Sequence, residues 1–501
     1  MVLAKPTFSR LLLFWLMNLG SFGPMLAQQC QVDWEAVTQV SDGMRSAFVP
    51  KLSAVGDTVH MTFVDGALYY VRSANKGRSW TIPFELVPTD SVPGQIFNRP
   101  ISASGNNVYV VWGNRLPSGV IRAVKIRRST NGGRDWLAPE VLLTNNPPEY
   151  FYQPLVAAVD SNVLVTVVKN LFPQNQYYLL HSSDSGNSWS PPQPINPLPG
   201  NYAYADLGVA VNRVHFVYRV EEDILHTASS DNGNSWSTPQ ILSEVDGHPG
   251  WYPDIGVTSS AVYVCWQDAK YGSSTGFSGT VLLRRSTDGG ETWGAEVRVS
   301  EQPSAAFSSI AVADSSVVVV WDDERNGVTQ GSIQLRASFD RGVTWCPETS
   351  AGDTLDIDID ASVTTDSRHI CVVWSASESP PTIPPRIFSR FGRFDRSNSV
   401  DWRTSQSIEG NMHLLIHPNP FNSSTQFNFG LPDRATVSLL IYDLLGRQVG
   451  MVAPGFYQAG YHSVTWNAGE MASGIYFARF TAVDEHEKLV YSKTNKLVLM
   501  K

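Results

Sequence analysis

Aromatic and charged residues recur at regular distances along the first two thirds of this chain, in positions suited to binding an oxygen-rich ligand. Flat aromatic faces stack on sugar rings, and carboxylate, amide and guanidinium groups bond hydroxyl groups. This combination favours a glycan ligand, and packing of the same aromatic rings within the fold is the alternative. The residues expected to contact a ligand are Arg99, Arg115, Tyr152, Tyr202, Tyr204, Trp251, Tyr252, Asp254, Asp268, Asp322 and Arg325.

Carboxylates of the same region could also carry out acid–base chemistry. A glycoside hydrolase uses two carboxyl groups about 5 to 10 Å apart, one of them the proton donor. The candidates are Asp254, Asp268, Asp322, Asp323 and Glu324. The sequence assigns a catalytic role to no single residue, so enzyme activity stays open. No spacing of Cys and His residues predicts a metal site, and we expect no cofactor.

Six copies of a short turn pattern separate these candidate residues. Each copy reads Ser-x-Asp/Asn-x-Gly-x-x-Trp, the first from Ser73 to Trp80 and the last from Ser338 to Trp345. The Asp or Asn can bond turn amides, the Gly supplies a positive φ, and the Trp buries apolar surface between neighbouring units. We expect a purely structural role for Asn75, Asn131, Asp184, Asp231, Asp288, Asp340, Trp80, Trp136, Trp189, Trp236, Trp293 and Trp345.

The distance between the turns is typical of a β-propeller. Successive copies start 47 to 57 residues apart, which is the length of a four-stranded blade. The sequence contains seven short apolar strands, the last at Cys371–Trp374, but only six copies of the turn. Residues Trp34–Ser41 resemble the strand after each turn, so we expect them to pair with residues 356–394 and close the ring. The sequence therefore predicts an all-β fold with seven blades, and six blades is the alternative.

The turn repeats resemble Asp boxes, also called bacterial neuraminidase repeats, and residues of about 34–395 are similar to a sialidase-superfamily propeller. The family includes exo-sialidases, other glycoside hydrolases and propellers that only bind, so the resemblance implies a fold more than an activity. A sialidase would need three arginines, a Tyr nucleophile activated by a Glu, and an Asp acid or base. The family's Phe-Arg-Ile-Pro signature falls near Phe48–Pro50, where the arginine is absent, and Phe97–Pro100 is only a scrambled version. This departure argues against a sialidase reaction.

In such a propeller, the loops that enter each blade gather at one mouth of the central channel. The loops between the second and third strands of each blade reach the same mouth. All the candidate ligand contacts fall in these two sets of loops, whereas the turn repeats lie away from the mouth. The resemblance thus implies that the candidate residues converge.

The N-terminus has the layout of a secretory signal peptide. Lys5 and Arg10 precede the apolar run Leu11–Leu19, and cleavage is expected near Ala27. The run is short for a membrane anchor. Cleavage would remove two positive charges and no negative one, taking the formal charge from −9 to −11. Nucleic acid is therefore not an expected partner.

The four cysteines permit three complete pairings in an oxidising compartment. Cys265 and Cys371 fall within strands, where buried free thiols are expected. A bond from Cys30 to a cysteine of the last blade would reinforce closure of the ring. Cys30 could instead carry a lipid, although Ala27-Gln-Gln-Cys30 lacks the small residue expected before a lipidated cysteine.

A different unit begins near Met412, with short alternating strands that predict a small immunoglobulin-like β-sandwich. Its motifs include His417–Asn422, Val437–Arg447 and Gly474–Phe477, followed by the terminal run Lys496–Lys501. The ordered set closely resembles the type A C-terminal sorting domain of the type IX secretion system. That resemblance implies export across an outer membrane, with release or surface attachment. An ordinary accessory module is the alternative.

Together these observations predict a signal peptide at residues 1–27, a propeller at 28–395, a linker at 396–411 and a sorting domain at 412–501. The mature chain would be secreted or held on the outer cell surface, without a transmembrane anchor. We expect its propeller to bind an extracellular glycan or a surface protein, and its C-terminal domain to bind the type IX machinery. The alternatives are an exo-acting glycoside hydrolase, such as a divergent sialidase, and a structural or adhesive surface protein.

Overall fold

The structure is a computed structural model. It describes residues 31–41, 46–87, 100–115, 121–144, 150–171, 174–195, 202–210, 213–272, 278–325, 331–352, 357–377, 384–395, 413–417, 421–431, 434–457, 460–469, 471–484 and 488–500. These residues form strands and turns, without a helix. Accordingly, no helix among them could span a membrane. The chain divides into two compact units, Met1–Ser399 and Val400–Lys501. The expected signal peptide, Cys30 and the expected linker lie outside the described residues.

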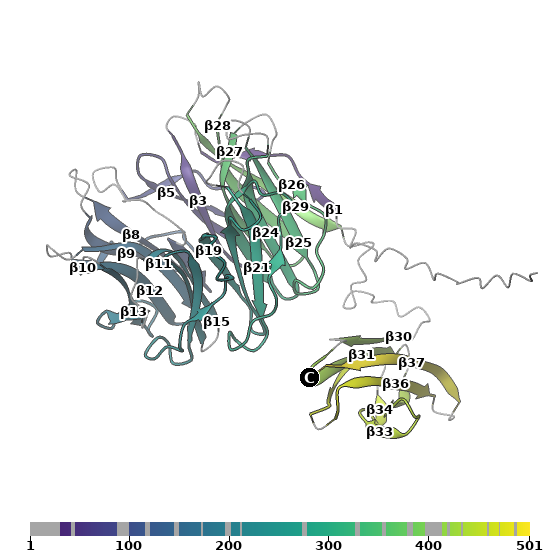
Figure 1. The fold of residues 1–501 in the computed structure, drawn as a ribbon. Helices are drawn as coiled ribbons and strands as arrows, with labels where there is room; N and C mark the ends of the chain where they lie inside the picture. Colours follow the sequence, from purple (N-terminus) through teal and green to yellow (C-terminus); the bar gives the residue numbers. More distant parts are fainter. Residues whose placement is uncertain are drawn as a thin grey trace, which may run out of the picture. The chain divides into compact units, whose positions relative to one another are not determined.

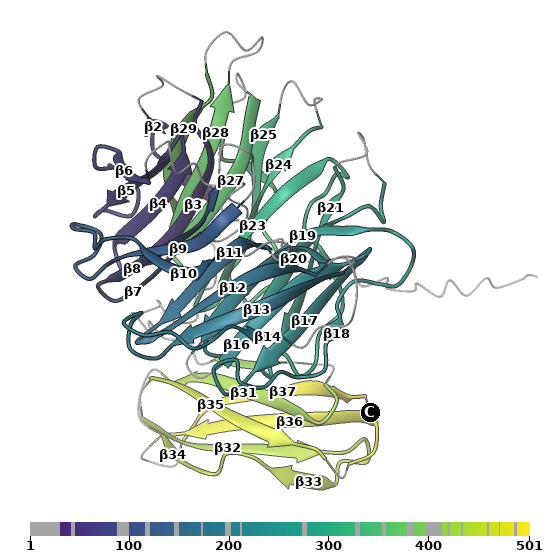
Figure 2. The same cartoon turned by 90° about the vertical axis from the view of Figure 1, so that its left-hand side faces the viewer.

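Seven antiparallel sheets form the larger unit within the described residues, and each is one blade of a propeller (Figures 1 and 2). Blade 1 contains β3 (Phe48–Val55), β4 (Thr58–Val64), β5 (Leu68–Ser73) and β6 (Phe84–Val87). Blade 2 contains β7 (Ile101–Ser104), β8 (Asn107–Arg115), β9 (Ile121–Ser129) and β10 (Glu140–Thr144). Blade 3 contains β11 (Tyr150–Val159), β12 (Asn162–Leu171), β13 (Gln174–Ser182) and β14 (Gln193–Pro194). Blade 4 contains β15 (Tyr202–Ala210), β16 (Arg213–Val220), β17 (Asp223–Ser229) and β18 (Gln240–Ile241).

The remaining blades follow the same order. Blade 5 contains β19 (Gly250–Val257), β20 (Val262–Asp268), β21 (Thr280–Ser286) and β22 (Val297–Arg298). Blade 6 contains β23 (Ala305–Ala313), β24 (Ser316–Asp323), β25 (Ser332–Ser338) and β26 (Thr349–Ser350). Blade 7 contains β27 (Ile357–Thr365), β28 (His369–Ser377) and β29 (Arg386–Asp395), completed by β1 (Gln31–Trp34) and β2 (Thr38–Gln39). The first strand of each blade lies beside the first strand of the next, and β27 lies beside β3. The predicted seven-bladed propeller is therefore confirmed.

Both ends of the propeller meet in blade 7. Strand β1 pairs antiparallel with β29, with Trp34 opposite Gly392, and β2 continues along the same strand with Thr38 opposite Ser389. The Arg390 guanidinium lies 5.1 Å from the centre of the Trp34 ring and donates to the Glu35 carbonyl at 3.1 Å. This is the expected closure, in which the N-terminal segment supplies the outer strands of the last blade.

The cysteines divide differently from the expected ring-closing bond. Cys265 and Cys371 are buried free thiols, as expected. Cys371 belongs to blade 7, so the last blade's own cysteine forms no disulfide. Cys346, which follows the turn of blade 6, is disulfide-bonded, and its partner lies outside the described residues. The disulfide therefore anchors its partner segment to blade 6, and not to blade 7, which closes the ring.

Second strands form the core of each blade because neighbouring blades cover both of their faces. Such strands read as continuous apolar runs instead of alternating ones. Val317 to Val320 of β24 are completely buried, and so is Trp321. The indole of Trp321 donates to Asp323 at 3.2 Å, and that of Trp266 on β20 donates to Asp268 at 2.9 Å.

The six repeat turns join the third strand of a blade to its fourth strand. In blade 4, the Ser229 hydroxyl donates to Asp231 at 2.7 Å and accepts the amide of Gly233 at 2.7 Å. The hydroxyl and the amide of Ser235 also donate to Asp231, and these bonds lower the pKa of the carboxyl to about 2. The turn is thus held by its own side chains, with no ligand required.

The Trp residues of the turns in blades 2 and 5 pack against the preceding blade. Trp136 of blade 2 meets Tyr70 of blade 1 edge to face at 4.8 Å, and Trp293 of blade 5 meets His226 of blade 4 at 4.9 Å. These contacts leave both Trp rings half-buried between blades. The turn residues thus fix both the end of a blade and its distance from its neighbour.

A buried pair of histidines lies below the turn of blade 5. His215 Nδ1 and His226 Nε2 are 3.1 Å apart. Gly290 of the turn (φ 87°) lies so close that a Cβ there would be 2.6 Å from His226 Cε1. Burial, and then the charge of Arg213, lower the pKa of His215 to about 4. Burial lowers that of His226 to about 3, with smaller contributions from His215 and Arg213.

The smaller unit is a sandwich of two sheets. One sheet contains β30 (His413–His417), β31 (Ser424–Leu431) and β35 (Gly460–Asn467). The other contains β32 (Ala435–Tyr442), β33 (Gln448–Met451), β34 (Gly455–Tyr457), β36 (Gly474–Val483) and β37 (Leu489–Leu499). Phe427 and Phe429 of the first sheet and Phe480 of the second are completely buried in a shared core. The predicted immunoglobulin-like sandwich is confirmed.

We expect the propeller to lose stability as the pH falls from 6.5 towards 4. Unfolded chains bind protons on these histidines below the ordinary pKa of 6.5, whereas the folded protein binds them only near pH 4 and 3. Because the unfolded state holds more protons in this window, the free energy of unfolding decreases as the pH falls, by on the order of 5 kcal/mol for the two histidines together. Thermal unfolding followed between pH 7 and 4 measures this slope.

The slope should become shallower in His226→Gln. The matched control is His248→Gln, because the side chain of His248 is 48% exposed and should leave the wild-type slope unchanged. Equal slopes in all three proteins would contradict the assignment of this pH dependence to the buried pair.

Candidate functional site

A cavity of about 730 Å³ occupies the channel at the centre of the ring. Ligand sites of small molecules commonly have volumes of about 300 to 1,000 Å³, so the cavity is large enough for one. All seven blades contribute to its wall through their first strands. The polar or small residues that represent them are Lys51, Ser102, Ala157, Asp206, Asp254, Ser309 and Ser362.

Within the described residues, bulges interrupt the first strands of blades 1 and 3 to 7 at the same level, near the end where the chain enters the blade. In each, the register with the second strand shifts and one non-glycine residue has a positive φ. β-Bulges re-aim side chains at barrel rims and beside active sites, and a positive φ stores strain there. The residues are Val49 (φ 52°), Gln153 (50°), Tyr204 (53°), Tyr252 (50°), Phe307 (49°) and Asp360 (58°). We call these six residues the bulge ring.

The bulge ring and the repeat turns lie at opposite ends of the blades. In blade 5, Gly250 at the start of the first strand pairs with Asp268, and Asp268 pairs with Thr280. Ser286, where the repeat turn begins, pairs with Val262 at the other end of the second strand. The mouth marked by the bulge ring is therefore separate from the turns.

Three aromatic members of the bulge ring come from consecutive blades and form a continuous surface. The rings of Tyr204 and Tyr252 have centroids 4.2 Å apart, and those of Tyr252 and Phe307 have centroids 4.6 Å apart. The Tyr252 hydroxyl donates to that of Tyr204 at 3.4 Å. Burial, and then this hydrogen bond, raise the pKa of Tyr252 well above its ordinary value. We call Tyr204, Tyr252 and Phe307 the aromatic arc.

Exposure differs along the aromatic arc. Phe307 is 42% exposed, which is unusual for a large apolar side chain. Tyr204 and Tyr252 are half-buried. The arc thus offers one open aromatic face backed by two rings that hold it in place.

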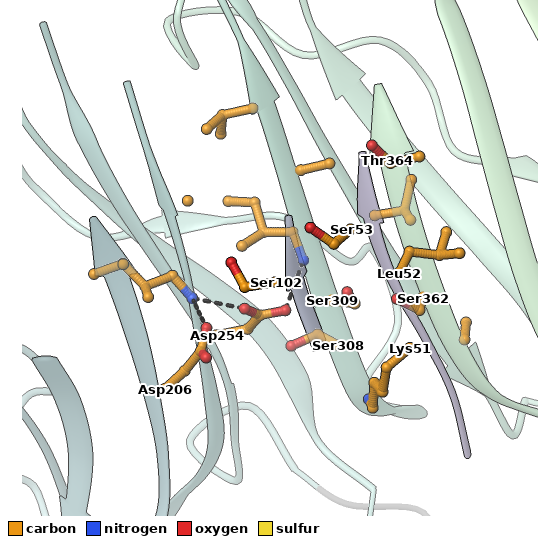
Figure 3. Close-up of a pocket in the computed structure, with 18 of the residues that line it drawn as sticks. Lys51, Leu52, Ser53, Ser102, Asp206, Asp254, Ser308, Ser309, Ser362 and Thr364 are labelled. Atoms are coloured by element: carbon orange, nitrogen blue, oxygen red, sulfur yellow. Dashed lines mark hydrogen bonds between the residues drawn. The ribbon is translucent and has the colours of Figure 1, made fainter. Parts of the chain in front are cut away.

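Polar side chains below the arc connect one first strand to the next. The hydroxyl oxygens of Ser53 and Ser102 accept the backbone N–H groups of Ala103 and Ala158 at 2.9 and 3.0 Å. Asp206 accepts from Ile255 N–H at 3.1 Å, and Asp254 accepts from Ile310 N–H at 3.1 Å (Figure 3). In every case the acceptor belongs to one blade and the donor to the following one.

Asp254 of the expected site is thus part of these interblade bonds. Its other oxygen accepts the amide of Ile255 at 2.8 Å. Asp322 is almost completely buried behind the bulge of blade 7, where it accepts the amides of Asp360 at 2.8 Å and Ala361 at 3.2 Å. Burial, and then the nearby Asp360 carboxyl, raise the pKa of Asp322.

Asp268 and Arg325 do not line the cavity. Asp268 is buried, and it accepts the Lys270 amide at 2.8 Å besides the Trp266 indole. Arg325 donates to Asp323 through two nitrogens at 2.7 and 2.8 Å and to Glu348 at 2.8 Å. Burial would raise the pKa of Asp323, but the bonds from Arg325 lower it. Both expected residues therefore form local contacts at the ends of second strands.

Of the remaining expected residues, only Trp251 has a side chain that the structure describes. Trp251 precedes the bulge of blade 5, and the guanidinium of Arg219 lies 6.0 Å from the centre of its ring. Arg115, Tyr152 and Tyr202 are residues of strands β8, β11 and β15, but their side chains lie outside the described part of the structure, as does the whole of Arg99.

Sequence reasoning did not select Phe307, Lys51 or Asp360, which all line the cavity. A signal for them exists in the alignment of the repeats. Val49-Pro-Lys51, Tyr252-Pro-Asp254 and Phe307-Ser-Ser309 stand at equivalent places before their second strands. Once Tyr252 is placed at a bulge, the same register assigns bulges to Val49, Phe307 and Asp360.

Metal ligands are not grouped in the described residues, where no three His, Cys, Asp or Glu side chains are placed to hold an ion. The site therefore consists of an aromatic surface, serine hydroxyls, carboxylates and the Lys51 ammonium group.

Comparison with known proteins identifies the smaller unit. Residues 415–493 match the secretion system C-terminal sorting domain. The resemblance of this unit to a type IX sorting domain is thereby confirmed, and the chain is exported, to be secreted or attached to the outer surface. Such a domain implies an interaction with the type IX machinery. Among curated proteins, no sequence matches the chain.

Solved structures similar to the larger unit include three proteins. A PL25 polysaccharide lyase, an ulvan lyase bound to -[GlcA(1-4)Rha3S]-, is 12% identical with a TM-score of 0.48, covering 71% of this chain and 95% of the lyase. YCF48 bound to D1 peptide is 14% identical with a TM-score of 0.42, covering 72% and 95%. NanB with Optactamide is 12% identical with a TM-score of 0.39, covering 72% and 70%. These likenesses carry no inference about the ligand.

We expect Asp254→Ala to destabilise the propeller by about 1 to 3 kcal/mol, because it leaves the Ile310 N–H without its side-chain acceptor. Asp254→Asn keeps an oxygen at the same place and should cost less than half as much. Urea unfolding of the two variants and the wild type measures the difference. Equal destabilisation by Ala and Asn would show that the charge of Asp254, and not its hydrogen bond, is what matters.

Proposed function

We propose that this exported protein binds a glycan at the mouth of its propeller, on the aromatic arc. The observation that carries the proposal is the exposed face of Phe307, held by Tyr252 and Tyr204 above a cavity with a hydroxyl-lined wall. Sugar rings present C–H faces to aromatic rings and hydroxyl groups to polar walls. A ligand of this kind satisfies both parts of the site at once.

Binding is favoured over hydrolysis because the candidate carboxylates are hydrogen-bonded to other groups of the protein. Acid–base catalysis needs carboxyl groups that can reach a substrate oxygen. Asp254 and Asp322 accept backbone amides, Asp268 accepts an indole and an amide, and Asp323 is held by Arg325. These four carboxylates are thus held by structural hydrogen bonds.

The sorting domain defines where this binding would take place. Under this proposal, residues 1–27 direct the chain out of the cytoplasm, residues 28–395 form the binding propeller and residues 412–501 direct its export. The ligand would then be a glycan outside the cell or on its surface.

Replacing Phe307 by Ala should weaken glycan binding about tenfold, because one aromatic stacking contact contributes roughly 0.5 to 1.5 kcal/mol beyond its buried area. Phe84→Ala is the matched control, since Phe84 is 45% exposed but lies on the outer strand of blade 1. A glycan array identifies ligands of the full chain, and titration calorimetry then gives their affinities. Wild-type silence on the array, or equal affinities of both variants, would refute the proposal.

Deleting residues 413–501 should abolish export of the propeller, because these residues include the matched sorting domain. Immunoblots of cells and medium from a host with a type IX system, expressing either the full or the shortened chain, test this. The shortened chain's unfolding temperature serves as the control for folding. Its release into the medium at the level of the full chain would contradict the assignment.

A further inference from the structure

We infer that the cavity holds a neutral sugar at the end of a glycan by two neighbouring hydroxyl groups, between Lys51 and Asp360, and that it excludes acidic sugars. The inference rests on the proposed glycan binding and specifies its ligand. It comes from the meeting of blades 7 and 1, where two charged side chains line the cavity that the aromatic arc also lines.

Lys51 and Asp360 line the same wall of the cavity. Their strands, β3 and β27, lie side by side where the ring closes. Asp360 is the bulge-ring residue of blade 7, and Lys51 follows the bulge residue of blade 1 by two positions. Lys51 is close enough that its charge opposes the rise that burial causes in the pKa of Asp360. The ammonium group of Lys51 and the carboxyl group of Asp360 therefore face the same part of the cavity.

Hydrogen-bonding capacity remains at both groups. The Lys51 ammonium carries three N–H donors, and it forms no ion pair or hydrogen bond within the described residues. The carboxyl of Asp360 receives the Val49 amide, which uses one of about four acceptor positions. A hydroxyl group both donates and accepts, so one hydroxyl of a sugar can accept from Lys51 while its neighbour donates to Asp360.

The charge of the wall disfavours an acidic ligand. Within the described residues, the charged side chains that line the cavity are Lys51, Asp206, Asp254 and Asp360. Asp206 and Asp254 each accept a backbone amide, so their carboxylates add negative charge to the wall but are less able than Asp360 to accept from a ligand hydroxyl. A ligand carboxylate or sulfate would meet one cation and up to three anions at low dielectric. A neutral sugar avoids that repulsion.

The test compares neutral and carboxylated forms of the same sugar on the full chain. Tetrasaccharides of glucose, galactose and mannose, and the same compounds oxidised to the 6-carboxylate, serve as probes in titration calorimetry. We expect the wild type to bind at least one neutral form at least tenfold more tightly than its oxidised form.

Two variants locate the effect. Lys51→Met keeps an unbranched side chain, shorter by one atom, but removes the N–H donors, and it should weaken neutral binding at least fivefold. Asp360→Asn keeps an oxygen for the Val49 amide and suits the positive φ, since Asn tolerates this region. It should also weaken neutral binding at least fivefold, while narrowing the gap between the neutral and oxidised forms.

Matched controls exist for both variants. Asp314→Asn changes another aspartate with a positive φ (53°), in the turn between β23 and β24, and Lys125→Met changes a lysine on β9. Both should bind as the wild type does. Oxidised sugars that bind as tightly as neutral ones, or neutral binding that depends on Phe307 but not on Lys51 and Asp360, would overturn this inference while leaving the proposed function intact. No binding of any sugar would instead remove the proposed function itself.

Discussion

The first strand of every blade is an edge strand, and the hydrogen-bonding groups on its free edge must find partners outside its own sheet. Unpaired backbone groups are costly when buried, and exposed edges invite pairing with other chains. Here the preceding blade supplies side-chain acceptors: Ser53, Asp206 and Asp254 reach amides of the next first strand. These bonds link the blades without filling the channel with backbone, so the cavity and the ring arise from one arrangement.

Backbone amides at the bulges also need hydrogen-bond partners from another blade. A bulge removes a residue from the ladder and leaves its amide without a strand partner. Gln267 accepts the amide of Phe307 at 3.3 Å, and Asp322 accepts that of Asp360 at 2.8 Å, each from the second strand of the blade before. These hydrogen bonds hold the backbone of Phe307 and Asp360 at a positive φ, and this conformation directs their side chains to the mouth. Strain and its support therefore come from different blades, so the mouth exists only in the assembled ring.

The parts of the structure that were predictable from the sequence depend on local chemistry. Ser229, Asp231 and Gly233 form their turn among themselves, and the resemblance of residues 34–41 to the other outer strands predicted the closure of blade 7. Residues of the mouth were less predictable because an aspartate that caps an amide and one that meets a ligand look alike in sequence. Asp268 and Arg325 are occupied by near neighbours, whereas Phe307 becomes significant only through its contact with Tyr252, 55 residues away in the chain.

Closure by the N-terminal strand also orders events in time. Gln31 pairs with Asp395, so the last blade needs residues from both ends of a segment longer than 360 residues. Bringing such distant segments together carries a loop-closure entropy and slows folding. Blades 1 to 6 can form as each is completed, but the ring stays open until residues 386–395 are available. The channel therefore forms in the last step of folding, when blade 7 closes the ring. In an exported chain, this step requires that nearly the whole propeller has reached the same compartment.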